Sequence, residues 1–181
     1  SQKFFLKIKN YELFDFKGKV IIITGAAGAI GSQAARFFST LGANVVISDI
    51  KEDDAVAIAK DIESETGNAA LGLKTDATDE ADVENLVKAT VKKFGKISAV
   101  INNVGWGANT GLWSSDTQKM VDSYKLNTLS AYNLTKFAMP YLKKEKNASV
   151  LFSGSMVGNT PSPEFIEYST AKAGLLNMAR S

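Results

Sequence analysis

The chain has 181 residues and a net charge of +2, with 45% apolar and 22% charged residues, as expected of one globular domain with a full hydrophobic core. Charges of both signs are scattered along it, so no nucleic-acid partner is predicted. Cysteine and histidine are both absent, which excludes disulfides, thiol catalysis and the commonest metal ligand. Acid–base chemistry is left to Tyr, Lys, Asp and Glu, and no metal site is predicted.

The sequence shows no membrane signal and predicts a short N-terminal arm followed by one domain. No apolar run approaches the ~20 residues of a membrane span, and the N-terminus lacks a signal pattern, so we expect a cytoplasmic protein without a membrane partner. Residues 1–13 alternate weakly and are expected to be an extended arm or the remnant of an expression tag. Residues 14–181 are expected to form one domain.

The first regular segment, residues 20–23, is a β-branched apolar run that fits a parallel strand buried on both faces. It leads through the turn Thr24-Gly25-Ala26-Ala27-Gly28-Ala29-Ile30-Gly31 into a predicted helix over 32–41. Glycines let the backbone approach a pyrophosphate, and a helix N-terminus supplies N–H groups and a favourable dipole. The turn therefore predicts a dinucleotide site. Its predicted contacts are Gly25, Ala29, Ile30 and Gly31.

A second strand, predicted over 43–48, ends at Asp49, which lies 24 residues after Gly25. That spacing is close to the one expected of a carboxylate that binds the adenosine ribose hydroxyls. A carboxylate would repel the 2′-phosphate of NADP. The alanines of the glycine turn offer that phosphate no cation, and the nearest cation in the sequence is Lys51. The predicted cofactor is therefore NAD, with Ile50 as a further contact.

Helices and strands continue to alternate to the end of the chain. Helices are predicted over 52–66 and 78–94, and a longer one over 115–143, which Pro140 can divide into two pieces. Strands are predicted over 69–75, 97–101 and 148–152. The alternation predicts an α/β fold with a doubly wound, mostly parallel sheet of the Rossmann type. In such sheets ligands bind at the carboxyl ends of the strands, where Gly25, Asp49, Asp76, Asn103 and Ser155 all fall.

Tyr168 and Lys172 are four residues apart, so on a helix they share one face. A phenol has an ordinary pKa near ~10, and a fixed ammonium beside it favours the phenolate, which makes Tyr168 a candidate base. Ser155, thirteen residues earlier, can hold the oxygen of an alcohol or carbonyl. Tyr132 and Lys136 repeat the spacing without such a serine, and we interpret them as an ordinary helix pair.

Together these motifs resemble the short-chain dehydrogenase/reductase family from about residue 14 onward. The resemblance implies that Asp76, with Ala77, approaches the adenine, and that Asn103 and Gly105 of Asn102-Asn103-Val104-Gly105 border the cofactor. It also implies that Asn127 holds a water in the proton path. The catalytic set it implies is Asn127, Ser155, Tyr168 and Lys172, with Tyr168 and Lys172 also contacting the cofactor.

The sequence departs from the family pattern in three places. Gly28 and Ala29 give the glycine spacing of the epimerase-like branch, but the Asn-Asn-x-Gly motif and the serine-to-tyrosine spacing argue against that branch. Val104 replaces an alanine. The chain also ends within the helix of Tyr168 and Lys172, whereas members of the family continue. We therefore expect a C-terminally incomplete sheet, little dehydrogenase activity from these 181 residues alone, and a homo-oligomer that covers the exposed edge.

The resemblance implies NAD-dependent interconversion of a secondary alcohol and a ketone. Ser48-Asp49-Ile50, Gly105-Trp106-Gly107 and Ser155-Met156 resemble the bacterial 7α-hydroxysteroid dehydrogenases, so a hydroxysteroid is the first expectation for the substrate. A sugar alcohol or a 3-oxoacyl substrate remains open. The alternative is a catalytically impaired remnant that binds NAD or oligomerises.

Overall fold

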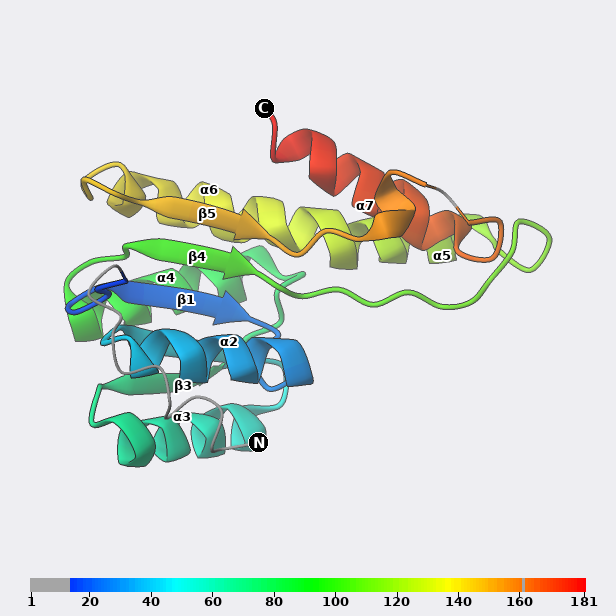
Figure 1. Cartoon of the computed structure of the whole chain (residues 1–181). Helices are drawn as coiled ribbons and strands as arrows, with labels where there is room; N and C mark the ends of the chain where they lie inside the picture. The colour runs from blue at the N-terminus through cyan, green and yellow to red at the C-terminus, as the bar shows by residue number, and fades with distance from the viewer. Residues whose placement is uncertain (1–13, 161) are drawn as a thin grey trace.

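The computed structural model describes residues 14–160 and 162–181, so the arm predicted over residues 1–13 lies outside the described part. The described residues form a parallel sheet with helices on both faces, which confirms the predicted Rossmann-type fold (Figure 1). The five strands follow the order β3-β2-β1-β4-β5. They are β1 (Val20–Thr24), β2 (Asn44–Asp49), β3 (Ala70–Lys74), β4 (Ala99–Asn102) and β5 (Ser149–Phe152).

Two hydrophobic clusters, one on each face, bury the sheet. Ile21 and Ile23 of β1 belong to the cluster beneath α2 and α3, whereas Ile22 belongs to the cluster beneath α4 and α6. Successive side chains of a strand point to opposite faces, so a strand covered on both sides must be apolar at every position. The four helices that cover these two clusters are α2 (Ala29–Thr40), α3 (Glu52–Thr66), α4 (Glu80–Phe94) and α6 (Ser130–Leu142).

The ends of α3 and α4 follow local sequence signals. Asp79 caps α4 by accepting hydrogen bonds from the backbone N–H groups of Ala81 and Asp82. Gly67 and Gly95 end α3 and α4 in the left-handed conformation, with φ of 72° and 77°. Glycine adopts this conformation without a steric penalty, which is why both predicted stops are confirmed.

The long helix predicted over 115–143 is divided, but not at Pro140. It consists of α5 (Thr117–Tyr124), a π-helical turn η1 (Lys125–Leu129) and α6. Pro140 lies inside the last turn of α6, where too little helix follows it to form a second piece. The prediction of a division at Pro140 was therefore wrong. The interruption falls at Asn127, one of the predicted catalytic residues.

After β5 the chain forms a 3-10 turn, η2 (Met156–Gly158), and then α7 (Ile166–Met178). Helix α7 packs against α5, η1 and η2 beyond the β5 side of the sheet (Figure 1). β5 pairs with β4 and forms one edge of the sheet, and its Leu151 is 43% exposed. Among residues 14–160 and 162–181, no helix combines the length and apolar character needed to cross a membrane.

Candidate active site

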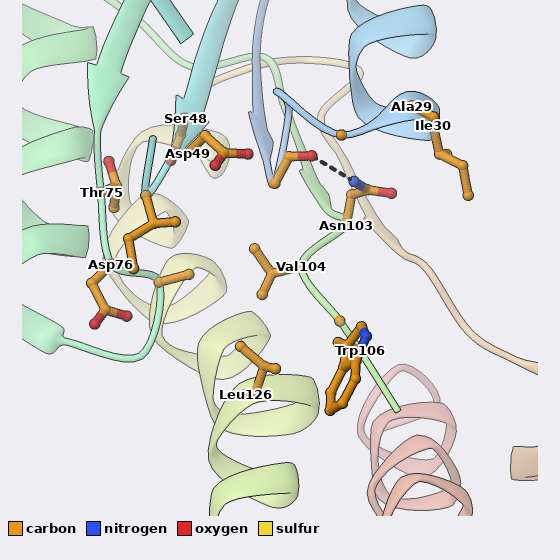
Figure 2. A pocket seen from close by; sticks show the side chains of 15 residues that line it. Ala29, Ile30, Ser48, Asp49, Thr75, Asp76, Asn103, Val104, Trp106 and Leu126 are labelled. Atoms are coloured by element: carbon orange, nitrogen blue, oxygen red, sulfur yellow. Dashed lines mark hydrogen bonds between the residues drawn. The ribbon is translucent and has the colours of Figure 1, made fainter. Parts of the chain in front are cut away.

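A cleft of about 450 Å³ opens at the carboxyl ends of β1 to β4 (Figure 2). Parallel strands bring their carboxyl ends to the same edge, so residues distant in sequence meet there. Nine of the twelve predicted cofactor-binding residues line the cleft, whereas Gly31, Tyr168 and Lys172 do not. Those nine are Gly25, Ala29, Ile30, Asp49, Ile50, Asp76, Ala77, Asn103 and Gly105.

The glycine turn forms the cleft wall at the start of α2. Gly25 has φ of 61°, and Gly28, at the N-cap of α2, has no side chain to satisfy the first N–H groups of the helix. Gly31 is buried behind the turn, where a Cβ atom would lie 2.6 Å from the Gly25 carbonyl oxygen. Gly31 therefore allows the helix to pack against the turn, and the uncapped helix start is suited to an anion.

Asp49 lies at the edge of the cleft. Its Oδ2 accepts a hydrogen bond from the Ala27 N–H at 3.0 Å, and its Oδ1 accepts one from the Lys51 N–H at 3.2 Å. These bonds hold the carboxylate between the glycine turn and the end of β2. The Lys51 ammonium is directed to Asp54, 4.0 Å away. A hydroxyl-bearing ribose fits this arrangement, because a carboxylate accepts from hydroxyls and repels a phosphate.

Lys172 is the buried cation of the predicted catalytic set. It is only 2% exposed, and its Nζ donates a hydrogen bond to the Ser153 carbonyl oxygen at 2.8 Å. Its Nζ also lies 5.5 Å from the centroid of the Tyr168 ring. Burial disfavours the charged form and lowers the pKa of Lys172 to about 8. The structure thus places an ammonium beside the phenol, as the four-residue spacing predicts.

A chain of hydrogen bonds links Lys172 to the glycine turn. Ser153, whose carbonyl oxygen holds Lys172, donates from its hydroxyl to Asn103 Oδ1 at 3.2 Å. Asn103 Nδ2 in turn donates to the Gly25 carbonyl oxygen at 3.2 Å (Figure 2). These contacts connect the ends of β5, β4 and β1, so α7, which carries Lys172, and the cleft are held in one frame.

Asn127 lies on the π-helical turn η1 and is fully buried. Its Oδ1 accepts from the Trp106 N–H at 3.0 Å, and its Nδ2 donates to the carbonyl oxygens of Trp106 and Ser123, both at 2.9 Å. Both hydrogens of the side-chain amide are therefore donated to protein groups, and Oδ1 accepts one hydrogen bond from the backbone. The role of Asn127 in holding a water in the proton path stays a prediction.

Ser155 precedes η2 in an extended conformation, and its hydroxyl makes no capping hydrogen bond. The side chain is partly exposed, so the hydroxyl is available to a ligand. The Tyr132 and Lys136 pair lies instead on α6, where Lys136 is 3.7 Å from Glu80 and 5.9 Å from the Tyr132 ring centroid. Neither residue lines the cleft, which agrees with their interpretation as a helix pair.

The structure shows contacts that the motifs did not predict. A Cβ atom on Gly107 would lie 2.6 Å from Tyr168 Cγ, so the backbone at Gly107 lies directly on the phenol ring. The repeated glycine at 105 and 107 was the available signal for this close approach. Ser153 carried no such signal, because its role depends on its backbone carbonyl. Thr75 and Leu126 also line the cleft and were not among the predicted contacts.

The comparisons with known proteins agree with this geometry. A family model described as short chain dehydrogenase matches residues 19–181. An uncharacterized oxidoreductase of Thermotoga maritima is 32% identical over 92% of this chain and 65% of its own length. The 7alpha-hydroxysteroid dehydrogenase of Escherichia coli K12 is 30% identical over 95% of this chain and 67% of its own. The chain thus spans about two thirds of these relatives.

A solved structure of 7 alpha-hydroxysteroid dehydrogenase, complexed with NADH and 7-oxo glycochenodeoxycholic acid, superposes with a TM-score of 0.88 at 29% identity, covering 93% of this chain and 66% of that one. Other relatives carry different names, among them a 3-oxoacyl-[acyl-carrier-protein] reductase of Thermotoga maritima and an NADP-dependent mannitol dehydrogenase of Alternaria alternata, at 28% and 29% identity. The fold and the site define a Rossmann-type α/β protein. The chain belongs to the short-chain dehydrogenase family.

The depressed pKa of Lys172 predicts how stability changes with pH. The folded chain loses this proton near pH 8, below the ordinary value of 10.5, so the unfolded chain holds more protons between those two values. The contribution of Lys172 to the free energy of unfolding therefore increases as pH rises through this range. Relative to the variant Lys172→Met, the wild type should gain stability from pH 8 to 10.5 and show a constant difference below pH 7.

Urea denaturation of both proteins at several pH values measures that difference. Lys136→Met, which removes an exposed lysine of α6, is the matched control. A difference between the wild type and Lys172→Met that stays flat from pH 7 to 10.5 would contradict the burial of this ammonium.

Proposed function

We propose that this chain is the cofactor-binding and catalytic part of an NAD-dependent oxidoreductase that interconverts a secondary alcohol and a ketone. The observation that carries the proposal is the buried Lys172 ammonium beside the Tyr168 ring, at the strand edge that also forms the dinucleotide cleft. A phenol becomes a useful base near neutral pH when a fixed positive charge favours its phenolate.

The residues divide the chemistry between them. Tyr168, as phenolate, removes the proton of the alcohol hydroxyl while the Ser155 hydroxyl holds that oxygen. The carbinol carbon loses a hydride as its C–O bond becomes a carbonyl, and a bound nicotinamide supplies the acceptor for that hydride. The same steps in reverse reduce a ketone. Lys172 stabilises the phenolate, and the turn around Asn127 leads the proton away from Tyr168.

NAD is the proposed cofactor. The uncapped start of α2 fits a pyrophosphate, and the carboxylate of Asp49 fits an unmodified ribose. Two solved relatives are described as NAD+-bound xylitol dehydrogenase and as 7 alpha-hydroxysteroid dehydrogenase with NADH. The proposal therefore rests on the chemistry of the cleft together with the cofactors of these relatives.

A hydroxysteroid is the proposed substrate class. Trp106 and Met156, which immediately follow Gly105 and Ser155, are 67% and 85% exposed, so apolar side chains flank the catalytic groups on two segments. This surface favours an apolar ring system over a polyol. The named relatives also include reductases of 3-oxoacyl groups and dehydrogenases of mannitol, so a panel of hydroxysteroids, polyols and 3-hydroxyacyl thioesters, followed by NADH absorbance, ranks the three classes.

Tyr168→Phe tests the function directly. In protein expressed from the complete reading frame, this variant should lose nearly all turnover, by about 10²-fold or more, because it removes the acid–base group. NAD affinity should stay within about threefold, since Tyr168 lies outside the cleft lining. Tyr132→Phe is the matched control and should retain activity. Equal losses in the two variants would refute the assignment.

Asp49→Ala tests the cofactor. The wild type should bind NAD more tightly than NADP, and the variant should bind NAD about tenfold more weakly and narrow the margin over NADP. Calorimetric titration of NAD and NADP into the wild type and the variant gives the four dissociation constants that this comparison needs. A wild-type preference for NADP would show that the Asp49 carboxylate does not set the choice.

We also propose that the protein assembles as a homo-oligomer. Helices α5 and α6, with η1 between them, carry exposed apolar side chains at helical spacing, namely Val121, Tyr124, Leu129 and Tyr132. Such a stripe is stabilised when a second copy covers it. Sedimentation should therefore show a dimer or larger, and the double variant Val121→Glu, Leu129→Lys should shift it to monomer. A monomeric wild type at micromolar concentration would disprove the proposal.

A further inference from the structure

Helix α7 carries a second buried charge, and the proposed chemistry does not use it. Within residues 14–160 and 162–181, the two buried charged side chains are Lys172 and Glu167, which is 4% exposed and immediately precedes Tyr168. Burying a carboxylate is costly unless hydrogen bonds and nearby positive charge compensate. The partners of Glu167 therefore indicate what the position does.

Both oxygens of Glu167 bind the segment between β4 and α5, residues 105–115, which we call the β4–α5 segment. Thr110 Oγ1 donates to Glu167 Oε2 at 2.7 Å, and Ser115 Oγ donates to Oε1 in a short hydrogen bond. The pKa of Glu167 lies below its ordinary value, mainly because of the hydrogen bond from Ser115. The positive charge of Lys119 lowers it further. One carboxylate thus holds both ends of the turn formed by residues 110–115.

Further contacts bring the same segment onto α7. Thr110 forms a parallel β-bridge with Phe165, just before the helix. Lys119 Nζ donates to the Ser114 carbonyl oxygen at 2.7 Å, which ties the turn to α5. Glu167, Thr110 and Lys119 also line a small cavity of about 180 Å³ together with Tyr168. The carboxylate is therefore adjacent to the phenol and to the segment that covers it.

The start of the β4–α5 segment touches the catalytic groups themselves. The Gly107 backbone lies on the Tyr168 ring, and a Cβ atom on Gly105 would come within 2.8 Å of both Lys172 Nζ and Asn127 Oδ1. Asn127 fixes the segment at Trp106, and Glu167 fixes it again at Thr110 and Ser115. The part that contacts Tyr168 lies between these two anchors.

We propose that Glu167 is a positioning residue, whose carboxylate clamps the β4–α5 segment to α7 and thereby holds the Tyr168 ring between Gly107 and Lys172. The inference rests on the proposed function, because it assigns Tyr168 as the reacting group. A displacement of about 1 Å in a reacting group can cost ~10²-fold in rate. Glu167 does not line the cofactor cleft, and its carboxylate binds Thr110 and Ser115, so it acts through Tyr168.

A simpler role for Glu167 would be that of an acid in the first turn of α7, where a negative charge favours the helix dipole. That role would stabilise the helix without any need for the hydroxyls of Thr110 and Ser115. The variants Thr110→Val and Ser115→Ala distinguish the two roles, since each keeps the carboxylate and removes one anchor.

The experiment uses Glu167→Gln, Thr110→Val, Ser115→Ala and the control Glu164→Gln, which neutralises an exposed acid just before α7. Hydrogen exchange of residues 105–115 should accelerate about tenfold or more in the first three variants and stay at the wild-type rate in the control. Exchange in β1 and β4 should not change. The two hydroxyl variants keep the test decisive if Glu167→Gln does not fold.

Kinetics on protein from the complete reading frame give the second readout. The first three variants should lower kcat by about tenfold to a hundredfold, with the dissociation constant of NAD within about threefold of wild type. Unchanged exchange in the three variants overturns the clamp, and faster exchange with unchanged kcat overturns the positioning of Tyr168. Failure of the proposed function is recognised separately, because Tyr168→Phe would then keep its turnover. The exchange measurement would still show whether Glu167 holds the β4–α5 segment.

Discussion

The burial of the Lys172 ammonium is the constraint on which the rest of the site depends. A cation that is only 2% exposed needs a fixed acceptor, and the Ser153 carbonyl oxygen at the end of β5 supplies it. That requirement holds α7 next to the carboxyl end of β5, close to Gly105. It also brings the Tyr168 ring within 5.5 Å of the ammonium. The position of Tyr168, the proposed base, therefore follows from the need of the buried Lys172 ammonium for a hydrogen-bond acceptor.

Two anchors on different helices hold the β4–α5 segment over this charge. Asn127 binds the backbone of Trp106 with its whole amide, and Glu167 binds the hydroxyls of Thr110 and Ser115. The π-helical turn at Asn127 is consistent with this arrangement, because such turns occur where a functional side chain displaces regular helix geometry. The β4–α5 segment is thus held by two buried polar side chains, Asn127 and Glu167.

The sequence predicted the elements whose signals are local. The glycine turn, the β-branched run of β1 and the left-handed stops at Gly67 and Gly95 depend on neighbouring residues, and the structure has all of them. Asn127, on the π-helical turn, binds Trp106, which lies 21 residues earlier, and no pattern of apolar residues records such a contact. Glu167 was missed for the same reason, since its partners lie 57 and 52 residues away.

The burial that positions Lys172 also limits the pH at which it helps Tyr168. An ammonium favours a phenolate only while it is charged, and the pKa of Lys172 is lowered to about 8 by its surroundings. The support that Lys172 gives to the phenolate therefore declines as the pH rises above that value. How far burial lowers the pKa of Lys172 depends on how completely α7, Gly105 and the end of β5 exclude water. Any change that opens the β4–α5 segment admits water to Lys172, raises its pKa toward 10.5 and weakens its field at Tyr168. Packing of this segment therefore controls both the geometry and the electrostatics of the pair.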